Sequence, residues 1–298
     1  MILSSPNPLY IGRFAPSPTG PLHLGSLYTA LASFLDARHH GGRWLLRIDD
    51  LDTPRNVDGA ADAILHCLHD FGLDWDSEID FQSRHVDEYT DQLHALFKAG
   101  NLYACRCSRK DLIGHALYPG YCRDAAYADD NRSALRVRTD MRRIAFHDGL
   151  QGHIDQNLSM EHGDFVVRRR DGIVAYQFAV VLDDRRQAVN HVVRGTDLLD
   201  STPKQIYLQQ LLDYPAPAYL HLPVIVDSKG QKLSKQTLAA PVDNRNSEQT
   251  LWQLLELLRQ NPPAELQGAP VAEQLRWAVT HWQPQALKKI RAIESPIH

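Results

Sequence analysis

The chain has 298 residues, of which 43% are hydrophobic and 23% are charged, and its formal net charge is -4. This composition is typical of a globular protein that can build a core in one or two domains, and the acidic balance argues against a nucleic-acid coat protein, which would be basic. No apolar stretch is long enough to cross a bilayer, and the first residues lack the basic segment of a signal peptide. We therefore expect a cytoplasmic protein with no membrane partner.

The first third of the chain predicts a nucleotide-binding unit. Residues 9–14 and 44–48 are expected to form buried strands, and apolar residues between them recur at helical spacing until Gly41-Gly42. Further helices are expected at about 57–71 and at 86–98. Strand, helix and strand in this order form a parallel βαβ unit, which binds ligands at the carboxyl ends of its strands. The turn that begins at Arg13 and the carboxylate of Asp49 both fall at such ends.

The amino-acid composition changes in the middle of the chain. Residues 103–165 are rich in Cys, Arg, Asp and His with weak periodicity, which indicates an inserted subdomain. Later strands are expected at 165–168, 173–176, 188–193 and 222–226, with a helix near 204–212 and helical text with Pro/Gly breaks from 247 onward. The predicted division is therefore 8–102 (first half of a nucleotide-binding domain), 103–165 (insert), 166–240 (second half) and 241–298 (small helical C-terminal region).

Two short segments carry groups that suit phosphate chemistry. The first is R-F-A-P-S-P-T-G-P-L-H-L-G-S, which begins at Arg13 and contains His23 and Gly25. Glycines let the backbone approach a phosphate closely, and the N-terminus of a helix favours negative charge. The second is K-L-S-K-Q, in which Lys232 and Lys235 bring two ammonium groups to a loop. A lone histidine or a pair of loop lysines is usually structural or solvated, so the complete pattern carries the inference.

Together these segments resemble the two signatures of class I aminoacyl-tRNA synthetases, usually written HIGH and KMSKS, and the run R-F-A-P-S resembles the glutamyl branch. The resemblance implies an α/β fold: a Rossmann-type catalytic domain with a zinc-containing insertion and a small helical C-terminal region. It also implies that ATP, with Mg²⁺, reacts with a carboxylate. His23, Lys232 and Lys235 would be catalytic, and His23, Gly25 and Lys235 would bind ATP. Gln236 departs from the usual serine of the signature, and we expect function to survive this change.

The same resemblance assigns a set of residues to the binding of glutamate. They are Arg13, Phe14, Ala15, Pro16, Ser17, Asp49, Tyr176 and Arg194. Arg13 and Arg194 suit a carboxylate clamp because a guanidinium group binds a carboxylate with two hydrogen bonds. Asp49 lies in R-I-D-D, where the glutamyl branch typically has Glu and the glutaminyl relatives have Asp. The negative charge for the substrate amine is kept, but its reach is one methylene shorter.

Three of the four cysteines lie close together in the chain. Cys105, Cys107 and Cys122 offer three ligands to zinc, which usually takes four. His115 could supply the fourth on general chemical grounds, and three free thiols are the alternative without metal. The resemblance points instead to Tyr118, because short glutamyl-synthetase-like proteins bind a structural zinc through C-x-C…Y-x-x-x-C. Cys67 lies on a helical apolar face and is expected in the core.

The length after the K-L-S-K loop suggests which branch the chain resembles. About 60 residues follow it, too few for the anticodon-binding region of a full glutamyl-tRNA synthetase. The truncated family with this layout is the glutamyl-queuosine tRNA(Asp) synthetases. Similarity to that family implies a monomer that activates glutamate without tRNA and transfers it to queuosine in the anticodon of tRNA(Asp). Candidate phosphate contacts are Arg106, Arg109, Lys110, Arg123, Arg136 and Arg138.

Three alternatives remain open from the residues. One is an ordinary glutamyl-tRNA synthetase that acts with a separate anticodon-reading partner. A second is a ligase that joins an activated amino acid to a small molecule. A third is a non-catalytic, zinc-containing RNA-binding module, against which the phosphate motifs argue.

Overall fold

The computed structural model describes residues 9–130, 132–231 and 242–295. Its first half is built on a parallel sheet with the strand order β1-β2-β3 and with helices α1 and α2 in the connections. The bounds are β1 Ile11–Phe14, α1 Leu24–His39, β2 Arg43–Ile48, α2 Ala60–Asp70 and β3 Asp80–Phe81. The predicted βαβ unit is thus confirmed. β2 is buried at five of its six positions, as expected for a strand that is covered on both faces.

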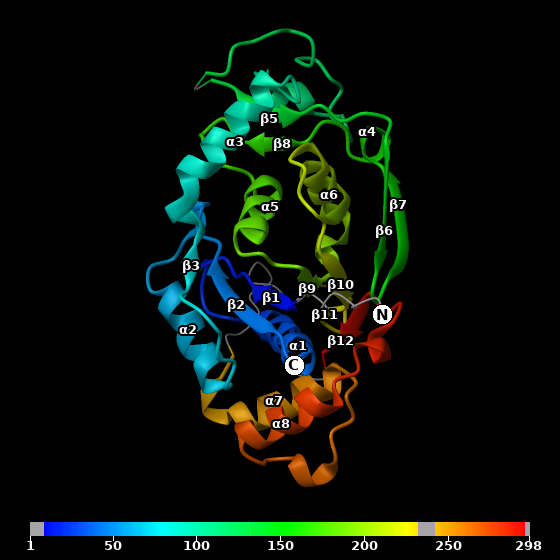
Figure 1. The fold of residues 1–298 in the computed structure, drawn as a ribbon. Helices are drawn as coiled ribbons and strands as arrows, with labels where there is room; N and C mark the ends of the chain where they lie inside the picture. The colour runs from blue at the N-terminus through cyan, green and yellow to red at the C-terminus, as the bar shows by residue number, and fades with distance from the viewer. Residues whose placement is uncertain (1–8, 131, 232–241, 296–298) are drawn as a thin grey trace, which may run out of the picture.

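The second half supplies two more parallel strands. β9 pairs with β10, and α5 and α6 belong to the same half. The bounds are α5 Tyr176–Arg186, β9 His191–Gly195, α6 Thr202–Leu211 and β10 Ala218–Leu222. Asn190 joins the halves, because its Oδ1 accepts from the Ile11 N–H at 2.8 Å and its own N–H donates to the Ile11 carbonyl at 3.1 Å. β9 therefore lies beside β1, so that the sheet β3-β2-β1 and the strands β9 and β10 follow one another in one layer, as in a Rossmann-type fold (Figure 1).

The residues between these halves form an antiparallel sheet and a hairpin. The sheet has the order β4-β5-β8, and the hairpin pairs β6 with β7. The bounds are α3 Val86–Lys98, β4 Leu102–Cys105, β5 Ala134–Val137, β6 Arg143–Asp148, β7 Gly152–Asn157, α4 Leu158–Glu161 and β8 Val166–Arg168. β6 also meets β10, where Asp148 lies opposite Tyr219. The hairpin lies within the predicted 103–165 insert but extends the sheet of the second half, so the predicted division remains a prediction.

The structure corrects the predicted strand at 173–176. Only an isolated bridge joins Arg168 to Val174, and Tyr176 begins helix α5. α5 is buried from Phe178 to Asp184, so it lacks the one-sided apolar pattern that identifies a surface helix. A short, fully buried apolar run does not distinguish a strand from a helix.

Two further differences concern the end of the chain. The expected strand at 222–226 is interrupted at Pro223, whose nitrogen cannot donate to a ladder, and it continues as a separate strand, β11. β11 (Val224–Val226) pairs in parallel with β12 (Ala292–Glu294), which the sequence did not predict.

The C-terminal helices pack on α1 and share its core (Figure 1). They are α7 (Ser247–Leu257) and α8 (Val271–His281), and they confirm the helical expectation and the break between them. The carboxylate of Asp36 in α1 accepts from the indole Nε1 of Trp282 at 2.8 Å and from the hydroxyl of Tyr10. Cys67 lies in the same core, as predicted. In the described ranges, no helix has both the length and the apolarity needed to cross a membrane.

A buried cluster of charges connects the two halves. The side chain of Arg47 in β2 is fully buried and donates to Asp49 at 2.7 Å and to Asp184 of α5 at 2.8 Å. Asp183, beside Asp184, accepts from the hydroxyl of Tyr89 in α3 at 2.5 Å. A buried carboxylate without a cation is costly, so this arrangement holds β2, α3 and α5 in one geometry.

We predict that Arg47→Met lowers the free energy of unfolding by about 3–5 kcal/mol, because it removes the cation paired with the buried Asp49 and one of the two cations paired with Asp184. Urea denaturation at pH 7 measures this change. The matched control is Arg143→Met, which removes an exposed partner of Asp155 and should cost no more than about 1 kcal/mol. Equal losses in the two variants would contradict the importance given to the buried cluster.

Candidate functional site

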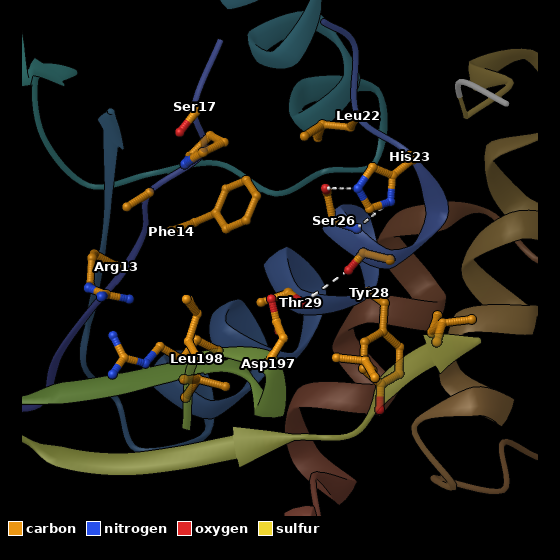
Figure 2. A pocket seen from close by; sticks show the side chains of 18 of the residues that line it. Arg13, Phe14, Ser17, Leu22, His23, Ser26, Tyr28, Thr29, Asp197 and Leu198 are labelled. Carbon is orange, nitrogen blue, oxygen red and sulfur yellow. Dashed lines mark hydrogen bonds between the residues drawn. The ribbon is translucent and has the colours of Figure 1, made fainter. Parts of the chain in front are cut away.

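A cavity of about 530 Å³ opens at the carboxyl ends of β1 and β9 and at the N-terminus of α1 (Figure 2). Its lining combines the first predicted motif with residues far away in the chain. The lining residues are Arg13, Phe14, Ala15, Pro16, Ser17, Thr19, Leu22, His23, Gly25, Ser26, Tyr28, Thr29, Tyr176, Val193, Arg194, Gly195, Asp197, Leu198, Pro223, Val224 and Ile225. This is the position at which Rossmann-type sheets bind ligands.

Most of the predicted site residues meet in this cavity. Those that line it are Arg13, Phe14, Ala15, Pro16, Ser17, His23, Gly25, Tyr176 and Arg194. Asp49 does not line it. Lys232, Lys235 and Gln236 lie outside the described residues, so their predicted roles remain predictions.

His23 caps helix α1. Its backbone is extended, and its ring Nδ1 accepts from the N–H of Ser26 at 3.3 Å while Nε2 lies 2.9 Å from the Ser26 hydroxyl oxygen (Figure 2). A capping side chain satisfies an N–H group that the first turn of a helix leaves unpaired. The imidazole is therefore held at the end of the helix that favours anions, next to the cavity.

Arg194 is only 4% exposed, and its guanidinium group is held from several sides. Nη2 donates to the hydroxyl of Thr202 at 2.8 Å, and Nε donates to Nε2 of His221 at 3.1 Å. Nη1 donates to the hydroxyl of Tyr176 at 3.4 Å, and that tyrosine is 37% exposed. The group thus faces the cavity beside a tyrosine hydroxyl, which is a suitable arrangement for a carboxylate.

Arg13 is also 4% exposed and is paired within the chain. Nε donates to one oxygen of Asp184 at 3.1 Å and Nη2 donates to the other at 3.4 Å. Burial raises the pKa of Asp184, but the charges of Arg13 and Arg47 outweigh it and hold that pKa below the ordinary value. Asp184 is therefore ionised at neutral pH, and it orients Arg13 at the edge of the cavity.

Asp49 lies behind the R-F-A-P-S turn. Its N–H donates to the carbonyl of Pro16 at 3.0 Å, and its carboxylate accepts from Arg47. Burial raises the pKa of Asp49 to about 6, although Arg47 opposes the shift. The predicted contact between Asp49 and a substrate amine thus remains a prediction.

Sequence reasoning missed several residues of the cavity. Tyr28 and Thr29 are three and four positions after Gly25, on the same face of α1, so helical periodicity could have identified them. The hydroxyl of Thr29 donates to the Gly25 carbonyl at 3.0 Å. Asp197 approaches the backbone so closely that a Cβ at Gly195 would lie 2.4 Å from its Oδ1. No signal in the sequence indicated this contact.

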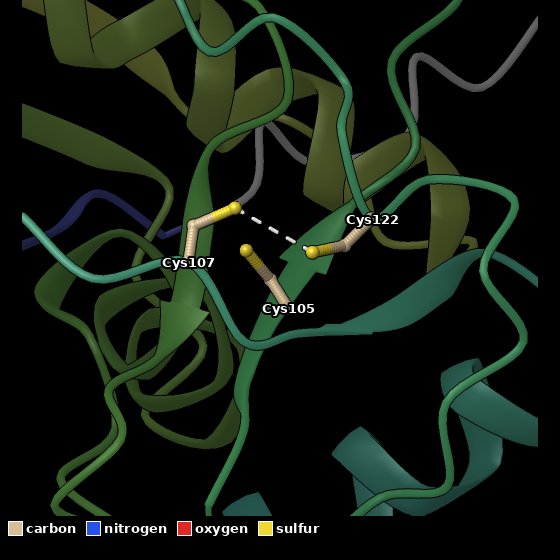
Figure 3. Close-up of side chains that lie close together, drawn as sticks. All are labelled: Cys105, Cys107 and Cys122. Carbon is tan, nitrogen blue, oxygen red and sulfur yellow. Dashed lines mark hydrogen bonds between the residues drawn. The ribbon is translucent and has the colours of Figure 1, made fainter. Parts of the chain in front are cut away.

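The three predicted cysteine ligands form a cluster within residues 103–165, the predicted insert (Figure 3). The sulfur atoms of Cys105, Cys107 and Cys122 lie within 4.8 Å of one another, and those of Cys107 and Cys122 are 3.5 Å apart. Two thiolates on a tetrahedral zinc ion with bonds of about 2.3 Å lie roughly 3.8 Å apart. The donor set and its spacing therefore fit a metal ion.

The fourth position is occupied by a phenol. The hydroxyl of Tyr118 lies 3.4 Å from the sulfur of Cys105 and 3.7 Å from that of Cys107. The alternative ligand, His115, is exposed and lies 2.9 Å from the hydroxyl of Tyr121. The geometry favours Tyr118 over His115 as the residue that completes the cluster.

Four of the six proposed phosphate contacts are engaged within the protein. Arg123 pairs with Asp164, and Arg106 pairs with Asp130. Arg136 and Arg138 lie over the rings of Tyr118 and Tyr103, respectively. Arg109 and Lys110 are exposed, so they remain the better candidates for contacts with a polyanion.

The model of the family "tRNA synthetases class I (E and Q), catalytic domain" matches residues 11–116 and 122–257. Tyr118 lies in the short gap between the matched segments. A "Glutamyl-Q tRNA(Asp) synthetase" of Ectopseudomonas mendocina is 50% identical over 288 residues, which cover 96% of this chain and 98% of that relative. The chain belongs to this class I tRNA synthetase family. A relative of the same name from Thiobacillus denitrificans is 52% identical, over 91% of this chain and 93% of its own length.

The fold is similar to that of solved glutamate enzymes. A glutamate tRNA ligase from Elizabethkingia meningosepticum, solved in complex with its amino acid, superimposes with a TM-score of 0.79 at 25% identity. The alignment covers 96% of this chain and 67% of that ligase. A glutamate-tRNA synthetase from Elizabethkingia anophelis has a TM-score of 0.78 at 24% identity, which supports the fold.

Proposed function

We propose that this protein activates glutamate with ATP in the absence of tRNA and then transfers the glutamyl group to the queuosine base of tRNA(Asp). The observation that carries this proposal is the match, over more than nine-tenths of each chain, to relatives named glutamyl-Q tRNA(Asp) synthetase, with about half of the aligned residues identical. The lining of the cavity supports the proposal, because one end has groups that suit a carboxylate and the other has groups that suit phosphates.

The glutamate end of the cavity is formed by Arg194, Tyr176 and Arg13. Arg194 and Tyr176 offer a cation and a hydroxyl to the side-chain carboxylate of glutamate. Arg13 offers a second cation at the carboxyl end of β1. A carboxamide bears no charge, so these buried guanidinium groups favour glutamate over glutamine. Asp49 is the proposed partner of the substrate amine.

The ATP end of the cavity is formed by the start of α1. The N-terminus of the helix, His23 and the backbone at Gly25 favour the phosphate groups. In the proposed reaction, an oxygen of the α-carboxylate of glutamate attacks the α-phosphorus of ATP, and pyrophosphate leaves with its Mg²⁺. The protein needs no nucleophile, because positioning and charge stabilisation suffice for such a transfer. Lys232 and Lys235 are proposed to stabilise the charge on the leaving group.

We predict that the protein catalyses ATP–pyrophosphate exchange that depends on glutamate, does not need tRNA and is not supported by glutamine. Lys235→Ala should lower kcat about a hundredfold, because it removes a charge donor to the leaving phosphates. The matched control is Lys229→Ala, an exposed lysine that precedes the same loop, and its kcat should be unchanged. Exchange driven equally by glutamine, or equal loss in both variants, would refute the assignment.

We also propose that the cluster of Cys105, Cys107, Tyr118 and Cys122 holds one structural zinc ion. When bound, the ion would cross-link the turn after β4 to the loop that follows it. We predict about one equivalent of zinc by elemental analysis and loss of most of it in Cys122→Ser. Cys67→Ser, at the buried cysteine outside the cluster, is the control and should keep its zinc. Full zinc content in Cys122→Ser would show that the ligand set is wrong.

The acceptor is tested with two forms of tRNA(Asp). One carries queuosine but lacks its 3′-terminal adenosine, and the other has an intact 3′ end but no queuosine. We predict that labelled glutamate attaches to the first form and not to the second. The opposite result would identify an ordinary synthetase, and attachment to neither form, with exchange intact, would indicate a small-molecule acceptor.

A further inference from the structure

Two fully buried side chains lie behind Arg194, on the side away from Tyr176. Asp148 ends strand β6, and His221 lies in the neighbouring strand β10. Nδ1 of His221 is 2.6 Å from Oδ2 of Asp148, and Nε2 of His221 accepts from Nε of Arg194 at 3.1 Å. A continuous chain of hydrogen bonds therefore runs from Asp148 through the imidazole to the guanidinium group.

The directions of these hydrogen bonds determine where the proton of His221 lies. Arg194 is always a donor, so Nε2 of His221 must carry the lone pair and Nδ1 must carry the proton that is donated to Asp148. The Thr202 hydroxyl accepts from Arg194, and its single proton can go to the Leu198 carbonyl at 3.2 Å or to Nε2 of His221 at 3.1 Å. Both directions agree with a lone pair on Nε2. Burial and the charge of Arg194 both lower the pKa of His221. Asp148 raises it, but the net effect is a pKa below the ordinary value. The imidazole is therefore neutral at pH 7.

Asp148 is itself anchored by the backbone. Its Oδ1 accepts from the N–H groups of Leu150 at 3.0 Å, Gln151 at 2.8 Å and His221 at 3.3 Å. The three N–H groups leave Oδ2 to face the imidazole. An ionised carboxylate with no exposure is retained here because every contact that it makes is with a donor.

We propose that Asp148 and His221 are positioning residues for the binding of glutamate. Asp148 selects the tautomer of His221 that accepts from Arg194, and His221 holds Nε of Arg194 so that Nη1 faces the cavity. This inference rests on the proposed function, in which Arg194 binds the substrate carboxylate. Neither residue lines the cavity, so both act through Arg194.

The central test is Asp148→Asn, which preserves shape and removes the charge. The asparagine Oδ1 keeps the three backbone N–H groups, so its NH₂ group must face Nδ1 of the imidazole. The proton of His221 then moves to Nε2, so that two donors, Nε2–H of His221 and Nε–H of Arg194, face each other and their hydrogen bond is lost. We expect KM for glutamate in pyrophosphate exchange to rise at least about tenfold, with KM for ATP within about twofold of the wild-type value.

A second pair of variants separates positioning from packing. His221→Leu removes both ring nitrogens and should raise KM for glutamate as Asp148→Asn does. His221→Gln supplies an amide oxygen that can accept from Arg194, and it should restore most of the affinity. Asp36→Asn is the matched control, because it also neutralises a buried aspartate that accepts hydrogen bonds on both of its carboxylate oxygens. The donors to Asp36 are Tyr10 and Trp282, so Arg194 is not involved. It should reduce stability and leave KM for glutamate unchanged.

The tautomer is measured directly on the wild-type protein by ¹⁵N NMR of labelled histidines, with His221→Gln used to assign the signal. A proton on Nδ1 at pH 7 supports the proposal, and a proton on Nε2 or an imidazolium ion overturns it. Unchanged KM for glutamate in Asp148→Asn, or equal rises of KM for glutamate and ATP, also overturns it. Wild-type protein without glutamate-dependent exchange would refute the proposed function instead, and the wild-type arm shows this before any variant is compared.

Discussion

The pairing of buried charges around Arg47 constrains the rest of the catalytic domain. Arg47 has no exposure, so Asp49, Asp183 and Asp184 must surround it closely. Asp184 then also binds Arg13, which brings the end of β1 against α5. Because a misplaced partner would leave a bare charge in the interior, few arrangements of β1, β2 and α5 are compatible with folding. The edge of the cavity is therefore positioned by the same contacts that hold the core together.

The two ends of the cavity offer different groups to a negatively charged ligand. The proposed phosphate end offers the backbone at the start of α1, with His23 as both the cap of the helix and part of the cavity lining. The proposed carboxylate end offers the guanidinium groups of Arg13 and Arg194, each bound to a buried partner that does not line the cavity. Preorganised groups of this kind stabilise developing charge without having to rearrange during the reaction.

The predicted insert, residues 103–165, has a small cluster of its own and also contributes apolar side chains to the core around α5. Its cysteine cluster, Tyr118 and Tyr103 form a small group of packed residues. Arg136 and Arg138 lie over the two tyrosine rings, and Arg123 binds the buried Asp164. Arginine side chains that the sequence presents as candidates for phosphate contacts are thus engaged in contacts within this part of the chain. Among the six candidate phosphate contacts, Arg109 and Lys110 are exposed and lie between Cys107 and Cys122 in the chain.

Local sequence patterns were enough to predict much of the fold and part of the candidate site. The motif from Arg13 to Gly25, the helix after it, the cysteine cluster and the family were all evident in the sequence, because each depends on residues near one another in the chain or on a complete motif. The partners of these residues were not evident. Asp184 lies 171 positions from Arg13, and His221 lies 73 positions from Asp148. The buried helix α5 and the strand β12 were also missed. Only the packing of distant strands and helices brings such groups together, because a single Asp or His carries no local sign of the cation that it will meet.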